Sequence, residues 1–212
     1  MVVADVMTKN PLFVHPDLSV HEARALIKRE KFGRLPVLDK DNKLVGIVTE
    51  RDLINASPSV ASTLDMYEMS YLLSKLKVEK VMQRKVITVT EDVVVEEAAR
   101  IMVDNEISAL PVMRSDVLVG IVSDGDLFRL FINLFGARKE GVRITLLVPD
   151  KRGELKCISE VIASHGGDVQ ALLISDGRDL TNKTCLLKVG NMTKEELVDS
   201  VREYSLEILD VR

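Results

Sequence analysis

Residues 46–52 read GIVTERD, and residues 120–126 read GIVSDGD. In both places a run of Leu, Val and Ile ends at a hydroxyl residue, Thr49 or Ser123, and an acid follows three positions later. A hydroxyl and an acid at this spacing can form a capping box, which marks the first turn of a helix. Each heptad is therefore predicted to join a buried strand to a helix, and its glycine lets the strand lie close to its neighbours.

The similarity extends outward from the heptads, and an internal repeat of this kind decides the fold. Equivalent residues are 75 positions apart before the central turn and 74 apart after it: Met7 and Met82, Ala23 and Ala98, Pro36 and Pro111, Gly46 and Gly120, Asp52 and Asp126. The one-residue difference falls between DKDNK and RSDV, which are turns by composition. Surface turns tolerate such a deletion.

Each copy predicts the element order β-α-β-β-α. A short extended segment at 12–14 or 86–89 comes first, a helix follows, and LPVL or LPVM and then LVGIV form two buried strands before the last helix. The first helix of each copy should start at one of two polar residues: Asp17 or Ser19, and Glu91 or Asp92. One copy alone would bury its sheet poorly, so we expect two copies packed face to face in one pseudo-symmetric α/β (α+β) module.

This pattern divides the chain into repeat 1 at 1–55, a linker at 56–78, repeat 2 at 79–135 and a further domain at 137–212. The linker begins with a loop, ASPSVAST, and continues as a helix with apolar residues at helical spacing: Met66, Met69, Leu72, Leu73 and Leu76. Its methionines either fill a core or interface or line a ligand pocket.

After Gly136 the pattern predicts β-α-β-β-α-β, the ferredoxin-like order. Gly166 and Gly167 should end its first helix, and Thr193 with Glu196 should cap its second. The joint at 127–135 carries too many apolar residues for one exposed helix: Leu127, Phe128, Leu130, Phe131, Leu134 and Phe135. Some of them should pack against a second subunit.

The two heptads are also where ligand chemistry fits. A helix start offers free N–H groups and a positive dipole, which favour a phosphate. The hydroxyl of Thr49 or Ser123 could donate to a phosphate oxygen, and the carboxylate of Asp52 or Asp126 could accept the hydroxyls of a ribose. The alternative is that these residues only cap helices, and the two roles are compatible.

The repeat resembles the CBS motif, and the pair resembles a Bateman module, through VMT and VMQ, GRLPV and SALPV, and GIVTERD and GIVSDGD. The resemblance implies two clefts that bind AMP, ADP, ATP or S-adenosylmethionine, with no cofactor required. It implies that Asp52 and Asp126 hold ribose and that Thr49 and Ser123 lie beside phosphate. Adenine would lie near the strand before each proline: Gly33, Arg34, Leu35 and Pro36, and Ser108, Ala109, Leu110 and Pro111.

The charges of the two heptads differ. Arg51 lies in the first, and Arg34 could approach it, whereas the second carries Asp124 and Gly125. An additional carboxylate repels a polyphosphate. We therefore expect the Thr49 site to prefer nucleotides and the Ser123 site to be weaker, empty or selective for a less anionic adenosyl compound.

The C-terminal segment is similar to an ACT domain through PDKRGEL and HGGDV. That family binds small effectors, often amino acids, beside its first loop, which here corresponds to Asp150, Gly153 and Leu155. The alternative is a plain loop that needs Gly153 for its turn, in a domain that only dimerises. The complete order is similar to that of acetoin-utilisation-type CBS-ACT proteins, which implies metabolic regulation.

Composition argues against several other functions. A net charge of -4, no Trp and 4% aromatic residues disfavour nucleic-acid binding. The N-terminus lacks a signal-peptide pattern and the apolar run at 127–135 is too short to span a bilayer, so a cytoplasmic, non-membrane protein is expected. The three histidines and two cysteines lack metal-ligand spacing, and no hydrolase or Walker motif is present.

These observations favour a non-catalytic homodimeric regulator that binds an adenine nucleotide and acts on a partner enzyme. The first alternative is a structural protein with empty clefts that scaffolds a partner enzyme. The second is an enzyme that uses a cleft carboxylate as a base, which would require turnover of an added nucleotide.

Overall fold

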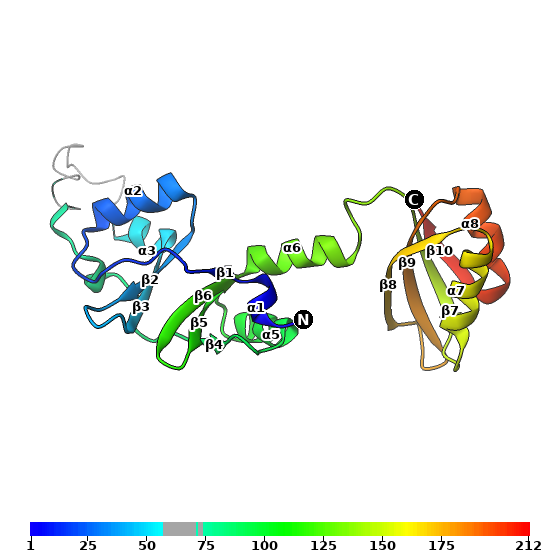
Figure 1. Ribbon diagram of the computed structural model, residues 1–212, viewed down its shortest axis with the longest axis horizontal. Coiled ribbons are helices and arrows are strands. Elements are labelled where there is room, and N and C mark those ends of the chain that lie inside the picture. The colour runs from blue at the N-terminus through cyan, green and yellow to red at the C-terminus, as the bar shows by residue number, and fades with distance from the viewer. Residues whose placement is uncertain (57–70, 72–73) are drawn as a thin grey trace. The chain divides into compact units, whose positions relative to one another are not determined.

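A computed structural model describes residues 1–56, 71 and 74–212 of the chain (Figure 1). It contains two compact units, Met1–Leu127 and Phe128–Arg212. Most of the predicted linker helix lies outside the described residues, including Met66, Met69, Leu72 and Leu73. In the parts that are described, no helix is both long enough and apolar enough to cross a membrane.

The first unit contains both repeats. The elements of the first are α1 (Val3–Val6), β1 (Thr8–Lys9), α2 (Val20–Glu30), β2 (Arg34–Leu38), β3 (Leu44–Thr49) and α3 (Glu50–Asn55). Those of the second are η1 (Val78–Lys80), β4 (Val89–Thr90), α5 (Val95–Asp104), β5 (Ala109–Arg114), β6 (Val117–Ser123) and α6 (Asp124–Leu134). The LPV and LVGIV segments form antiparallel pairs, β2 with β3 and β5 with β6, as predicted.

The two repeats exchange their N-terminal segments, which the sequence did not predict. Strand β1 pairs with β6 of the second repeat, with Thr8 opposite Ile121, and Gln83 bridges Ile47 in β3 of the first repeat. The four-stranded sheet of the first unit therefore has the strand order β1-β6-β5-β4. Strand β1 of the first repeat thus joins the sheet of the second, and a single bridge from Gln83 reaches β3 of the first.

Gly46 and Gly120 are required by this exchange. A Cβ atom at Gly46 would contact the side chain of Met82, and a Cβ atom at Gly120 would contact the side chain of Met7. Both methionines belong to the exchanged segments. The glycine of each heptad therefore allows close approach, as predicted, and the neighbour is a methionine from the other repeat.

The predicted helix starts agree with the structure in the first repeat only. Ser19 caps α2, and its hydroxyl accepts the N–H of Glu22 at 3.1 Å. In the second repeat the cap of α5 is Val94, which has no side-chain cap bond, so the prediction of Glu91 or Asp92 was wrong. Their carboxylates accept hydrogen bonds elsewhere, Asp92 from Thr90 and Glu91 from Arg114.

The predicted N-terminal extended segments are shorter in the structure. At 12–14 only Val14 forms a bridge, to Val37, and the segment predicted at 86–89 contributes a strand only at Val89–Thr90. Leu76, from the described end of the linker, packs against the core of the first repeat.

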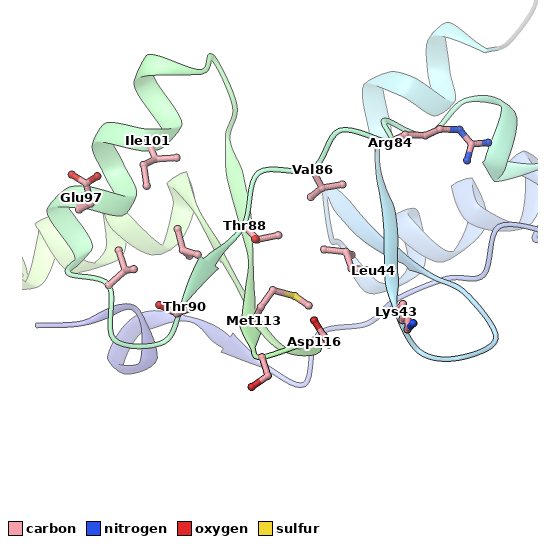
Figure 2. A pocket seen from close by; sticks show the side chains of 13 residues that line it. Lys43, Leu44, Arg84, Val86, Thr88, Thr90, Glu97, Ile101, Met113 and Asp116 are labelled. Carbon is pink, nitrogen blue, oxygen red and sulfur yellow. The ribbon is translucent and has the colours of Figure 1, made fainter.

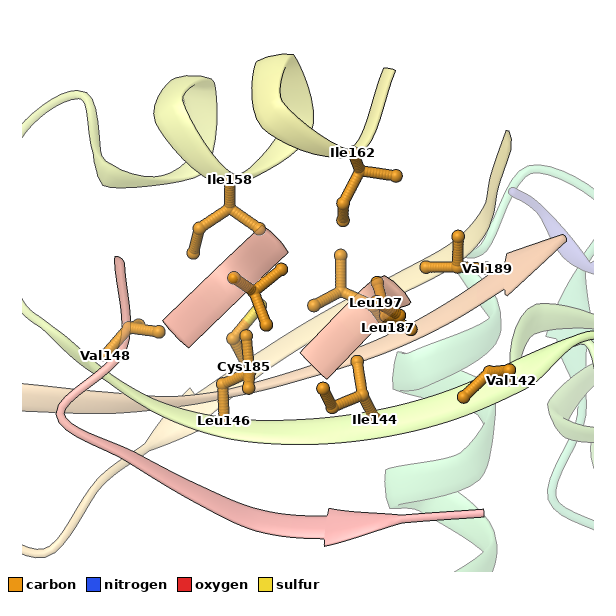
Figure 3. Close-up of a cluster of buried hydrophobic side chains, with 11 residues drawn as sticks. Val142, Ile144, Leu146, Val148, Ile158, Ile162, Cys185, Leu187, Val189 and Leu197 are labelled. Carbon is orange, nitrogen blue, oxygen red and sulfur yellow. The ribbon is translucent and has the colours of Figure 1, made fainter. Parts of the chain in front are cut away.

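The C-terminal unit has the predicted order of helices and strands: β7 (Val142–Pro149), α7 (Glu154–Ser164), β8 (Asp168–Asp176), β9 (Asn182–Gly190), α8 (Lys194–Val201), η2 (Arg202–Tyr204) and β10 (Glu207–Val211). Its antiparallel sheet has the order β10-β7-β9-β8. Figure 3 shows Ile158, Ile162 and Leu197 packed over the side chains of β7 and β9, so the helices cover one face of the sheet.

Local signals account for the ends of these helices. Thr193 caps α8 and shares a capping box with Glu196, as predicted. Gly166, just after α7, has a φ of 80° in the left-handed region, where glycine has no Cβ penalty.

Candidate functional site

The starts of α3 and α6 carry the same hydroxyl–carboxylate pair. The Thr49 hydroxyl donates to Oδ2 of Asp52 at 2.7 Å, and the Thr49 N–H donates to the same oxygen at 2.9 Å. The corresponding distances from Ser123 to Oδ2 of Asp126 are 2.6 and 2.8 Å. The predicted capping role is therefore present at both positions, and one oxygen of each carboxylate already accepts two hydrogen bonds.

The surroundings of the two carboxylates differ. Asp52 is half-buried, and its Oδ1 lies 3.3 Å from Nε2 of Gln83, a residue of the exchanged segment. Asp126 is only 6% exposed. A ligand hydroxyl would reach Asp52 more readily, because burial restricts access to Asp126.

The side chain of Arg34 contacts Ser108 and the second heptad. Its backbone lies opposite Thr49 in the β2–β3 ladder, but its Nε donates to the Ser108 hydroxyl at 3.0 Å. Its Nη2 lies 3.3 Å from Oδ1 of Asp124. The expectation that the Arg34 guanidinium approaches the first heptad was wrong, because the cross-repeat partners of Arg34 belong to the second.

The residues just before and at the two prolines differ in exposure. Leu35 and Leu110 are fully buried in the two repeat cores, so only their backbone could lie beside an adenine ring, and their place in the site stays a prediction. Pro36, Ala109 and Pro111 are also buried, whereas Gly33 is exposed and Arg34 and Ser108 are half-buried. The carbonyls of Gly33 and Ser108 accept the N–H groups of Glu50 and Asp124, so each segment closes a helix start.

A cavity of about 810 Å³ lies within the first unit and is lined by both repeats (Figure 2). Its volume is in the range of small-molecule pockets. The lining residues are Lys43, Leu44, Arg84, Val86, Thr88, Val89, Thr90, Val93, Glu97, Ile101, Met113, Ser115 and Asp116. None of them belongs to the predicted site. The cavity and the predicted site are adjacent along the chain, because Gln83, which lies beside Asp52, directly precedes Arg84.

Two charged side chains of the cavity are engaged by protein groups. Arg100 donates to Glu97 at 2.8 and 2.6 Å, and these hydrogen bonds lower the pKa of the Glu97 carboxyl. Arg84 donates to the Glu79 carbonyl at 3.1 Å, and Figure 2 shows its guanidinium directed away from Thr88. The sequence analysis did not single out the lining residues because they lie outside any motif, on turns, strands and helix α5 that only the fold brings together.

The first loop of the C-terminal unit has its own ion pairs. Asp150 lies 3.7 Å from Lys183, and the buried Glu154 lies 3.1 Å from Lys151. Gly153 has a φ of 89°, so the turn itself favours glycine. Leu155 is 37% exposed. These contacts account for the loop without a ligand, and the effector role remains a prediction.

Among the described residues, no group of three or more His, Cys, Asp or Glu side chains could hold a metal ion.

Residues 3–59 and 78–133 match the family model described as the CBS domain. The crystal structure of the CBS domain pair of protein MJ0100, in complex with 5′-methylthioadenosine and S-adenosyl-L-methionine, is 32% identical with a TM-score of 0.53. It covers 66% of this chain and 98% of that chain.

Two further solved structures align over the same region. A protein from Vibrio cholerae described as an acetoin utilization protein (AcuB) is 31% identical with a TM-score of 0.54, over 66% of this chain and 97% of that chain. CBSX2 in complex with AMP is 32% identical with a TM-score of 0.50, over 62% of this chain and 96% of that chain.

Proposed function

The chain belongs to the CBS domain family, and on this premise we propose that its pair of repeats binds an adenine nucleotide or an adenosyl compound as a regulatory sensor. One observation carries the proposal. Solved CBS pairs that align over 98% and 96% of their own lengths are complexes with S-adenosylmethionine and 5′-methylthioadenosine, and with AMP. The proposed role is regulatory and not catalytic.

The proposed contacts are those of the two heptads. Asp52 and Asp126 accept ribose hydroxyls, Thr49, Arg51 and Ser123 lie beside a phosphate, and adenine lies near the exposed or half-buried residues before each proline: Gly33, Arg34 and Ser108. The Thr49 and Ser123 hydroxyls donate to Oδ2 of the carboxylates, so a ribose hydroxyl would be accepted by Oδ1. Binding would then favour one arrangement of the helix starts, which is the basis of a regulatory response.

The C-terminal unit is proposed to be a ferredoxin-like ACT domain, on the basis of its β-α-β-β-α-β order. A small effector such as an amino acid would bind at Asp150, Gly153 and Leu155, in competition with the Lys183 and Lys151 ion pairs of the loop. The protein is proposed to be a cytoplasmic homodimer that regulates a partner enzyme.

A scaffolding role is the second candidate, and the surface of α6 favours it. Phe128, Phe131 and Leu134 are 67%, 54% and 53% exposed. Apolar side chains gathered in this way commonly mark an interaction surface. On this alternative the clefts stay empty and the two units only assemble a complex.

A thermal-shift screen tests the sensor. AMP, ATP, S-adenosylmethionine and 5′-methylthioadenosine are added separately to the full chain. A ligand at 100 times its Kd should add about 2.7 kcal/mol of stability, because it binds only the folded state. The double variant Asp52→Ala, Asp126→Ala should lose the shift. If none of the four compounds raises the Tm of the wild-type chain at millimolar concentration, the scaffolding role is the better account.

A further inference from the structure

Two methionines at equivalent positions hold the exchanged segments against the opposite repeat. The atom nearest to the position of a Cβ at Gly120 is Sδ of Met7. The atom nearest to a Cβ at Gly46 is Sδ of Met82. Met7, from the first repeat, packs against the core of the second, and Met82, from the second repeat, belongs to the core of the first. Each thioether therefore joins its own segment to the other repeat.

The backbone pairing that accompanies these thioethers is short. Strand β1 pairs with β6 through only two residues, Thr8 and Lys9. Gln83 makes a single bridge with Ile47, through hydrogen bonds of 2.8 and 3.0 Å. So short a ladder supplies little stability of its own. The packing of the methionine side chains is therefore an important part of each connection.

The two methionines differ in their access to solvent. Met82 is only 8% exposed, whereas Met7 is half-buried and is followed by the exposed residues 8–10. A small oxidant such as hydrogen peroxide therefore reaches the thioether of Met7 more readily than that of Met82. Met1, at 59% exposed, and Met102, at 4%, provide an exposed and a buried methionine of the same unit for comparison.

Oxidation changes what the Met7 side chain can pack against. The thioether sulfur attacks one oxygen of the peroxide and the O–O bond breaks. A proton moves to the departing oxygen, which leaves as water. The product is a polar sulfoxide in place of an apolar thioether, and such a group disrupts a packed core. Because the sulfur fills the space beside Gly120, the side chain must leave this contact to hydrate its new oxygen.

We propose that Met7 is an oxidation-sensitive modification site, and that conversion of its thioether to the sulfoxide releases residues 7–9 from the sheet of the second repeat. Val3 is fully buried in the core of that repeat, so the release is local and the start of the chain stays anchored. Met82 is the protected member of the pair. The proposal goes beyond ligand sensing, because it gives the module an oxidant as a second input.

Treatment of the full chain with increasing hydrogen peroxide, followed by peptide mass spectrometry and thermal unfolding, tests the proposal. Met7 should gain an oxygen at lower peroxide than Met82 or Met102. Its oxidation should lower the Tm of the wild-type chain by about 2–8 °C. Met7→Leu replaces the thioether by hydrocarbon of similar volume and should keep its Tm in peroxide. The matched variant Met82→Leu should lose as much as the wild type at the same peroxide concentration.

Hydrogen exchange locates the effect in the fold. The Asn10 N–H donates to the Val119 carbonyl at 3.1 Å, just beyond β1. It should exchange at least about tenfold faster once Met7 is oxidised. The Gln83 N–H, which donates to the Ile47 carbonyl, is the control and should exchange at its former rate.

Three results would overturn the proposal. One is a Met7→Leu chain that loses as much Tm in peroxide as the wild type, because this variant retains every other methionine. Another is oxidation of Met82 before Met7. The third is an unchanged exchange rate at Asn10 in chains whose Met7 is oxidised, whatever happens to the Tm.

Discussion

At the start of α3, Asp52 is half-buried and has Gln83 beside it, whereas at the start of α6 the equivalent Asp126 is only 6% exposed. The acid that follows each cap, Glu50 or Asp124, also has different neighbours. Asp124 in α6 faces Arg34, while the residue equivalent to Arg34 in the other repeat is the uncharged Ala109. The repeats thus share the capping box but not its surroundings. Equal motifs in a duplicated module therefore need not form equal sites.

The largest expected effect concerns the feature that both repeats share. Gly120→Ala should lower the free energy of unfolding by about 1–3 kcal/mol, because its Cβ would overlap the side chain of Met7. Urea denaturation measures the loss. Met7→Ala in the same chain should make the combined loss smaller than the sum. Gly33→Ala is the matched control, since nothing lies within 4 Å of a Cβ there. Equal losses from Gly33→Ala and Gly120→Ala would contradict the exchange.

Replacing the two acids should reveal their unequal burial. Asp126→Asn should cost about 1–3 kcal/mol, the range for weakening a buried hydrogen-bonded group. Asp52→Asn should cost about 1 kcal/mol, typical of a helix cap. Both are read from chemical denaturation, with the exposed Glu195→Gln as the control. A larger loss at Asp52 than at Asp126 would reverse the comparison.

The first helices of the repeats provide a smaller contrast. Ser19→Ala should lose about 1 kcal/mol, and Val94→Ser should gain a few tenths to about 1 kcal/mol, since only α2 has a side-chain cap. The hydrogen bond from Ser19 lowers the pKa of the Glu22 carboxyl. A carboxyl whose pKa is lower in the folded state stabilises that state when the pH is above the unfolded-state pKa. This stabilisation is lost as the pH falls through the folded-state pKa.

The cost of Ser19→Ala should therefore shrink as the pH falls from 7 toward 3, while the effect of Val94→Ser should change less. Thermal unfolding across this range measures both. A cost of Ser19→Ala that grows on acidification would show that the Ser19–Glu22 bond does not act as described.

The smallest expected effect is at the cross-repeat ion pair. Arg34→Ala should cost only about 0.5 kcal/mol, because Asp124 is 51% exposed and solvent screens the pair. A double-mutant cycle with Asp124→Asn isolates the coupling. A coupling energy of zero would show that the Arg34–Asp124 pair does not distinguish the two helix starts energetically.

Local chemistry made much of the fold predictable. The 75-residue offset revealed the repeat, and the hydroxyl–acid spacing located the starts of α3, α6 and α8 at Thr49, Ser123 and Thr193. The order of helices and strands in the C-terminal unit followed from its alternation of strand and helix periods. Such features depend on residues that are near one another in the chain.

What could not be predicted depends on contacts between distant residues. The pairing of β1 with β6 joins residues more than 100 positions apart, and the sequence of neither strand indicates which strand it pairs with. The contacts of the Arg34 side chain also join distant residues, since Ser108 and Asp124 are 74 and 90 positions away. Asp92 looked like a cap but its carboxylate accepts from Thr90, a local competition that the pattern does not resolve. The cavity residues are ordinary Val, Thr and turn residues, without a motif.

Native mass spectrometry of the full chain, incubated with equal amounts of AMP, ATP, S-adenosylmethionine and 5′-methylthioadenosine, tests the sensor most directly. The account predicts a mass increase that matches an adenosyl compound and disappears in the Asp52→Ala, Asp126→Ala double variant. A wild-type spectrum with only the free chain at every ligand concentration would contradict it.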